Sequence, residues 1–200
     1  MNTIILAFII MFIISILLAD GAFPPASFGI KKEIFLLAGQ SNMAGIGGVV
    51  GQKWDKFVPP ECSADPRILQ LTKNLTWEEA HDPLHKDIDN GKPCGVGPGM
   101  PFSNMLLRAS GVMTHHISSF WVAVTSRAGR YVDIVRKAQL EMDLPNIFCI
   151  DVDGLEVNRN DELHLTTSAQ VQLGRMFADV ILYCTMNFNK DFCAPYMTTK

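Results

Sequence analysis

An apolar run at residues 34–38 ends at Gly39, and three polar residues, Gln40-Ser41-Asn42, follow it directly. A short apolar run bounded by glycine is typical of a strand buried in the centre of a sheet. In open α/β sheets, ligands bind beyond the carboxyl ends of the strands, so a serine at this point projects into a crevice. The pattern therefore predicts that Ser41 is a nucleophile placed at the end of the first strand.

Other short apolar runs alternate with amphipathic stretches along the chain. We expect strands at 67–71, 120–124 and 147–152, and helices at 77–80, 102–108, 127–142 and from Thr167 onward. Thr167 and Gln170 have the spacing of a capping box, which marks the start of a helix. Strands that alternate with helices predict an α/β fold with a parallel sheet.

Length, composition and charge narrow the class of protein. A chain of 200 residues with 48% apolar and 18% charged residues suits one globular domain, which we place at 32–186, with a tail at 187–200. The formal net charge is −3 and no long basic run occurs, so the sequence does not indicate a nucleic-acid partner. Nothing in it indicates an oligomeric state.

The first residues have the character of a targeting segment. Residues 4–18 are almost entirely apolar, and the small residues at 19–21 offer a cleavage site, so residues 1–21 resemble a secretory signal peptide. An uncleaved membrane anchor is the alternative, but about 15 apolar residues fall short of the roughly 20 needed to span a bilayer. We therefore expect a secreted protein without stable membrane insertion.

The cysteines and histidines do not predict a metal site. The five cysteines form no Cys-x-x-Cys pair, which argues against zinc. In an oxidising compartment Cys62 and Cys94 are the first pair expected to form a disulfide, whereas Cys149 lies in a strand-like run and is expected to be a buried thiol. His81 and His85 are four residues apart, but the proline between them disfavours a helix that would align them. We expect neither a metal nor an organic cofactor.

Asp161 and His164 lie three residues apart, between the last expected strand and the last helix. This spacing allows the carboxylate to accept a hydrogen bond from Nδ1 of the imidazole, which leaves Nε2 free to face Ser41. Serine is a weak nucleophile and needs such a base, and the carboxylate fixes the tautomer of the imidazole. The alternative is structural: Asp161 accepts bonds within its own loop, His164 begins a helix, and Ser41 completes a turn.

Three blocks of sequence together resemble a known family. They are Gly39-Gln40-Ser41-Asn42-Met43-Ala44-Gly45, then Pro83-Leu84-His85 with residues 94–100, and Asp161-Glu162-Leu163-His164-Leu165-Thr166-Thr167. Over about 34–102 and 121–182 the chain resembles the SGNH-hydrolase superfamily, and within it the plant-type carbohydrate esterases with a sialate-O-acetylesterase-like (SASA) domain.

The resemblance implies a fold, a reaction and a set of site residues. The fold is a three-layer SGNH/flavodoxin-like parallel sheet flanked by helices. The reaction is removal of O-acetyl groups from carbohydrate by a triad of Ser41, His164 and Asp161. The remaining oxyanion and substrate-binding groups are expected to be the backbone N–H of Ser41 together with Gln40 and Asn42.

The chain departs from the family between the two matching stretches. Members carry a Gly-Gly-Thr block and a Gln-Gly-Glu block there, which complete the oxyanion hole, whereas this chain has only residues 109–119 and neither block. We therefore expect central elements to be missing, with weakened catalysis and exposed apolar edges. The alternative function is a catalytically inactive carbohydrate-binding protein, in which Trp54 and Trp77 stack on sugar.

Overall fold

The computed structural model describes residues 32–88, 91–109, 119–123, 129–144 and 147–186. The expected signal peptide at 1–21 and the expected tail at 187–200 lie outside these ranges. The chain divides into two units, Met1–Phe35 and Leu36–Lys200. In the first unit the described residues, 32–35, are exposed and form neither helix nor strand.

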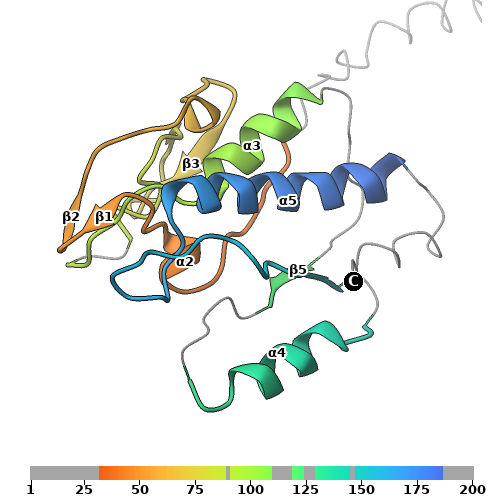
Figure 1. Ribbon diagram of the computed structural model, residues 1–200. Helices are drawn as coiled ribbons and strands as arrows, with labels where there is room; N and C mark the ends of the chain where they lie inside the picture. The colour runs from red at the N-terminus through yellow and green to blue at the C-terminus, as the bar shows by residue number, and fades with distance from the viewer. Residues whose placement is uncertain (1–31, 89–90, 110–118, 124–128, 145–146, 187–200) are drawn as a thin grey trace, which may run out of the picture. The chain divides into compact units, whose positions relative to one another are not determined.

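The second unit mixes helices with short strands (Figure 1). In chain order the described elements are α2 (Ser41–Ala44), β1 (Val49–Val50), β2 (Lys53–Trp54), the 3-10 turn η1 (Pro60–Cys62), β3 (Leu69–Leu71), β4 (Trp77–Glu79), α3 (Gly99–Arg108), β5 (Ser119–Val122), α4 (Val132–Leu140), β6 (Ile147–Ile150) and α5 (Thr167–Met186). The strands form three two-stranded sheets, of which β1–β2 and β3–β4 are antiparallel and β5–β6 is parallel.

The parallel pair β5–β6 confirms two of the predicted strands. Its register pairs Ser119 with Ile147 and Val122 with Ile150, and the N–H of Ala123 donates to the carbonyl of Ile150 at 3.1 Å. Both strands are rich in β-branched and aromatic residues, which favour extended backbone. Over the described ranges this parallel sheet has two strands, and the larger three-layer arrangement is not observed there.

The predicted strand at 34–38 is wrong. These residues pair with no described strand, and the side chains of Ile34 and Leu36 are 78% and 89% exposed. A strand is stable when neighbours on its sheet take up its backbone hydrogen-bonding groups. Neither β5 nor β6 pairs with this segment, so its apolar composition is not sufficient to make it a buried strand.

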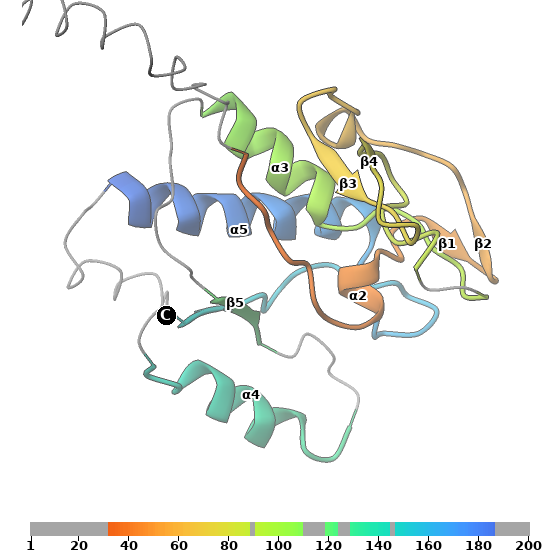
Figure 2. The same cartoon turned by 180° about the vertical axis from the view of Figure 1, so that it is seen from behind.

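The main core lies where α3 packs against α5, as both views show (Figures 1 and 2). Phe102 of α3 meets Phe177 of α5 edge to face, with ring centroids 6.3 Å apart. Gly174 allows the close approach, because a Cβ there would collide with the carbonyl oxygen of Pro98. The other buried members of this cluster include Ile150, Val152, Leu165, Ala169, Leu173, Ala178, Val180 and Ile181.

The start of α5 matches the prediction at Thr167, although the cap differs from a capping box. The Oγ1 of Thr166, one residue earlier, accepts the N–H of Ala169 at 3.3 Å. Gln170 is fully buried, and neither polar atom of its amide has a hydrogen-bond partner among the described residues, so it does not reach back to the cap. Within the described ranges, no helix is both long and apolar enough to cross a bilayer.

The predicted helix at 77–80 is a strand. Trp77 and Glu79 of β4 pair with Leu71 and Leu69 of β3 in an antiparallel hairpin. Glutamate favours helices in isolation, but the hydrogen bonds offered by β3 override that weak local preference. The predicted strand at 67–71 is confirmed in its second half, as β3.

The expected disulfide between Cys62 and Cys94 is not formed. Cys62 is 1% exposed and packs with Ala80, Val96 and Met100 in a second apolar cluster, so its thiol faces the interior. The thiol of Cys94 instead donates to a backbone carbonyl two residues away, at 3.6 Å. Cys149, expected to be buried, is half-buried in β6.

Helix α4 is shorter than the expected 127–142. No described residue of α4 is buried, and Ile134 and Val135 are 69% and 43% exposed. Arg136 forms an ion pair with Asp151, which follows β6, so a charged contact ties this helix to the parallel sheet. The apolar side chains that were expected to pack one face of this helix are therefore exposed, at Ile134 and Val135.

Candidate active site

Ser41, His164 and Asp161 form a continuous hydrogen-bonded chain. The Oγ of Ser41 lies 2.9 Å from Nε2 of His164, although the two residues are 123 positions apart. The Nδ1 of His164 lies 2.8 Å from Oδ2 of Asp161. With Nδ1 as the donor to the carboxylate, Nε2 is left as an acceptor for the serine hydroxyl. The structure therefore brings together the three residues predicted from their sequence context.

The turn at 161–164 is stabilised by hydrogen bonds to the side-chain carboxylate of Asp161, its first residue. Oδ1 of Asp161 accepts the backbone N–H groups of Leu163 and His164 at 3.0 and 2.9 Å, while Oδ2 faces the imidazole. Glu162, inside the turn, has φ +50°, a conformation that is strained for a residue with a side chain. The His164 carbonyl accepts the N–H of Asn158 at 2.6 Å, which closes the loop on itself.

These contacts also set the charge state of Asp161. Partial burial opposes ionisation of this carboxyl, but the hydrogen bonds from the backbone and ring of His164 and from the N–H of Leu163 outweigh it and lower its pKa. Asp161 is therefore a stable carboxylate that can orient the imidazole and stabilise a positive charge on it.

Ser41 is the first residue of the one-turn helix α2. This helix starts after Gln40, whose side chain is exposed and whose carbonyl accepts the N–H groups of Met43 and Ala44. Residues 32–40, the described part of the chain before it, contain no strand, so the expected position of Ser41 at the carboxyl end of the strand at 34–38 is wrong. The N–H of Ser41 has no acceptor among the described residues, as is usual for the first turn of a helix.

The end of α2 packs closely against a second backbone segment, at Gly95 and Gly97. Gly45 ends the helix with φ +93°, and a Cβ there would come within 2.8 Å of the backbone of Gly95 and Gly97. The carbonyl of Gly45 accepts the N–H of Gly95 at 2.8 Å. Because this approach is backbone against backbone, a glycine is required at position 45.

Asp82 is a buried carboxyl that contacts Gly97, one of these glycines. Its Oδ1 accepts the N–H of Gly97 at 3.4 Å, while Oδ2 has no partner among the described residues. Burial raises the pKa of Asp82 from 3.8 to about 6, although N–H donors from Gly97 and Leu84 act in the opposite direction. Burial, together with the charge of Asp82, also raises the pKa of the Cys62 thiol.

Asn42 is engaged with the loop that carries His164. Its Oδ1 accepts the N–H of Leu165 at 2.9 Å, and its Nδ2 donates to the carbonyl of Leu163 at 3.3 Å. The side chain predicted to bind the oxyanion or the substrate thus has backbone partners on both sides of the catalytic-site histidine. The sequence carried no signal for this contact, since its partners lie more than 120 positions away.

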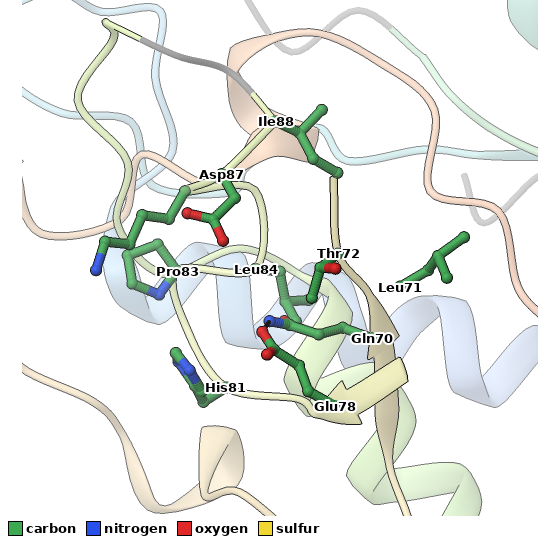
Figure 3. Close-up of a pocket in the computed structure, with 10 residues that line it drawn as sticks. Gln70, Leu71, Thr72, Glu78, His81, Pro83, Leu84, Asp87 and Ile88 are labelled. Carbon is green, nitrogen blue, oxygen red and sulfur yellow. Dashed lines mark hydrogen bonds between the residues drawn. The ribbon is translucent and has the colours of Figure 1, made fainter. Parts of the chain in front are cut away.

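A small pocket lies apart from the hydrogen-bonded chain. It has a volume of about 110 Å³ and is lined by the β3–β4 hairpin and residues 81–88 (Figure 3). On one wall Nε2 of Gln70 donates to Oε1 of Glu78 at 2.9 Å. Its lining residues include none of Ser41, Asp161 and His164. The described residues contain no cluster of three or more residues able to hold a metal.

Comparison with known proteins defines the class. The sequence model of the family described as carbohydrate esterase, sialic acid-specific acetylesterase (SASA), matches residues 31–117 and 112–183. The chain belongs to this carbohydrate esterase family, as its motifs predicted.

One relative of the chain is from Arabidopsis thaliana. The probable carbohydrate esterase At4g34215 is 35% identical over 237 residues, an alignment that covers 76% of this chain and 90% of the relative. The X-ray structure of that Arabidopsis protein is similar to this one with a TM-score of 0.68 and 32% identity, over 74% of this chain and 97% of the other.

These comparisons also show where the chain differs from its relatives. The alignment spans 237 positions but contains only 76% of a 200-residue chain, so the relative has residues with no counterpart here. The two family matches overlap at 112–117, inside the interval 109–119 that was expected to be shortened.

Proposed function

We propose that this protein is a serine esterase that removes O-acetyl groups from carbohydrate. The observation that carries the proposal is the hydrogen-bonded chain from the Ser41 hydroxyl through His164 to Asp161. Membership of a carbohydrate esterase family supports both the ester chemistry and the sugar substrate. The chemistry uses no metal or organic cofactor.

In the proposed reaction, Oγ of Ser41 attacks the acetyl carbonyl carbon while Nε2 of His164 takes the hydroxyl proton. The tetrahedral intermediate collapses, His164 protonates the departing sugar oxygen, and the acetyl group stays on Ser41. Water then attacks this acetyl-enzyme with His164 as the base, and acetate leaves as Ser41 regains its proton. Asp161 stabilises the imidazolium that forms in each half-reaction.

The oxyanion hole is the weak point of this site. The N–H of Ser41 is the remaining backbone donor, and the exposed side chain of Gln40 lies next to it in sequence. The two absent family blocks would have supplied further donors. Because loss of one oxyanion donor costs roughly 2.7–4 kcal/mol, or about 10²–10³ in rate, we propose slow turnover.

A catalytically inactive carbohydrate-binding protein is the second candidate. The shortened interval at 109–119 favours it, as does the 54% exposure of Trp77, which leaves an aromatic face available to sugar. Trp54 suits this role less, because it packs against the second apolar cluster. Binding of an acetylated oligosaccharide without release of acetate would support this candidate.

We also propose that the protein acts outside the cell. The resemblance of residues 1–21 to a signal peptide supports this location, and so does a glycosylation acceptor triplet at Asn74, whose surroundings are exposed. Recovery of the mature chain from the medium of cells that express the full sequence would test it.

Purified wild-type protein and Ser41→Ala should be compared on p-nitrophenyl acetate and on an O-acetylated oligosaccharide, with acetate release as the readout. We expect turnover by the wild type and loss of it in the variant, because the hydroxyl is the nucleophile. Equal rates for the two proteins would contradict the proposal.

A further inference from the structure

The side chain of Asn42 makes two hydrogen bonds that flank His164. It accepts from the N–H of Leu165 at 2.9 Å and donates to the carbonyl of Leu163 at 3.3 Å. These are the residues immediately after and before the histidine. Asn42 itself immediately follows Ser41, so neighbours of both reacting side chains are joined directly.

The loop that carries His164 is already shaped by its own contacts. Asp161 binds the N–H groups of Leu163 and His164, and the N–H of Asn158 binds the His164 carbonyl. These bonds shape the loop backbone, and the contact of Nδ1 with Oδ2 of Asp161 orients the imidazole within the loop. They do not set its distance from Ser41, which belongs to a different part of the chain.

The contact between the loop and α2 therefore decides whether the imidazole reaches the hydroxyl. Among the described residues, the side-chain hydrogen bonds that join the two segments include the bond between Ser41 and His164 and two bonds of Asn42. The first is the bond that the reaction uses and breaks. The other two remain throughout the reaction, because neither backbone partner takes part in the chemistry.

We propose that Asn42 is a positioning residue that holds the imidazole of His164 against Ser41. This inference rests on the proposed serine esterase function. An amide suits the role because it offers an acceptor and a donor together, and a backbone N–H and a carbonyl are presented to it. A displacement of about 1 Å between nucleophile and base can cost about 10²-fold in rate, so the effect on turnover is large.

Asn104 provides a matched control. Its Nδ2 donates to the backbone carbonyls of Glu61 and Ser63 at 3.0 and 2.9 Å, so it also ties a helix to a loop through two backbone contacts. It lies on α3, and none of its partners belongs to the hydrogen-bonded chain of the site. Asn104→Ala should therefore lower stability about as much as Asn42→Ala without changing the catalytic rate.

The kinetic experiment compares Asn42→Ala, Asn42→Asp and Asn104→Ala with the wild type on p-nitrophenyl acetate. We expect Asn42→Ala to lower kcat about 10²-fold with little change in KM, and Asn104→Ala to leave kcat unchanged. In Asn42→Asp the carboxylate faces the Leu163 carbonyl and repels it, but a protonated carboxyl can donate to it. The ratio of the Asn42→Asp rate to the wild-type rate should therefore rise as the pH falls.

A second measurement separates this inference from the proposed function. The imidazole signals of His164 can be followed by NMR in protein labelled with ¹⁵N-histidine, and assigned with a His164→Gln variant. We expect Asn42→Ala to move these signals toward those of Ser41→Ala, because the bond between hydroxyl and imidazole is lost in both. Unchanged imidazole signals in Asn42→Ala would overturn the inference, even if kcat falls as it would for an oxyanion donor. Equal activity of wild type and Ser41→Ala would overturn the esterase proposal. The NMR comparison would still show whether Asn42 holds His164 against Ser41.

Discussion

Replacing the buried carboxyl of Asp82 by an amide should change how stability depends on pH. Asp82 is 7% exposed, and burial raises its pKa from 3.8 to about 6. Asp82→Asn keeps the size of the side chain and the acceptor for the Gly97 N–H, but the new group stays neutral at every pH. The variant therefore isolates the effect of one buried charge.

The raised pKa of Asp82 sets the sign of the pH dependence of stability. Below about pH 4 the carboxyl is neutral in both the folded and the unfolded chain, and the stabilising contribution of the neutral form is fully present. As the pH rises from about 4 through 6, the unfolded chain ionises first and this contribution is lost. At about 1.4 kcal/mol per pH unit, a pKa change from 3.8 to about 6 corresponds to about 3 kcal/mol.

Urea unfolding of wild type and Asp82→Asn between pH 4 and pH 8 tests this reasoning. We expect the free energy of unfolding of the variant to rise relative to that of the wild type by up to about 3 kcal/mol between about pH 4 and 7. The comparison removes the contribution of Asp161, whose lowered pKa has the opposite effect because its stabilisation is lost as the pH falls. A difference between the two proteins that stays constant over this pH range would refute the argument.

Three further predictions concern the site, the core and the thiols. Asp161→Asn should lower kcat on p-nitrophenyl acetate by about 10⁴-fold, because an amide at this position favours the wrong tautomer of His164; a loss of less than about 10-fold would argue against its role. Gly174→Ala should destabilise the protein by about 1–3 kcal/mol in thermal or urea unfolding, since the clash with Pro98 exceeds the gain of about 1 kcal/mol in helix propensity; a stabilised variant would contradict this packing. Cys62 should resist alkylation until the protein unfolds, and Cys94→Ser should change stability by less than about 0.5 kcal/mol; a loss of 2 kcal/mol or more would indicate a disulfide.

The local sequence pattern predicted secondary structure correctly where the fold supplies the neighbouring elements that the pattern requires. The sequence predicted Val171, Phe177, Val180, Ile181 and Cys184 on one side of α5; the first four are buried, and the side chain of Cys184 lies outside the described part of the chain. The strands β5 and β6 were predicted from short apolar runs, and each has the other as a neighbour. In these elements the periodicity of the side chains agrees with the surroundings that the fold supplies.

Prediction from local sequence was wrong where contacts with distant residues determine the secondary structure or the burial of a side chain. Residues 34–38 have the composition of a buried strand, but no described strand pairs with them, and all of them except the half-buried Leu37 are exposed. Residues 77–79 carry two glutamates and could be helical, but β3 offers them a hydrogen-bonded edge. Cys62 and Cys94 both lie in loop-like sequence, yet the first packs in an apolar cluster and no disulfide joins the two.

The sequence by itself determined the chemical groups of the candidate site, because a serine followed by asparagine and an Asp-x-x-His before a helix are local patterns. Tertiary structure decided that Ser41 and His164 meet at 2.9 Å, and that the Asn42 amide is bonded to the loop that carries His164. The physical reason is that a distance between groups 123 positions apart depends on how the whole chain packs. Local preferences fix which side chains are available, while packing and backbone hydrogen bonds fix which of them come into contact.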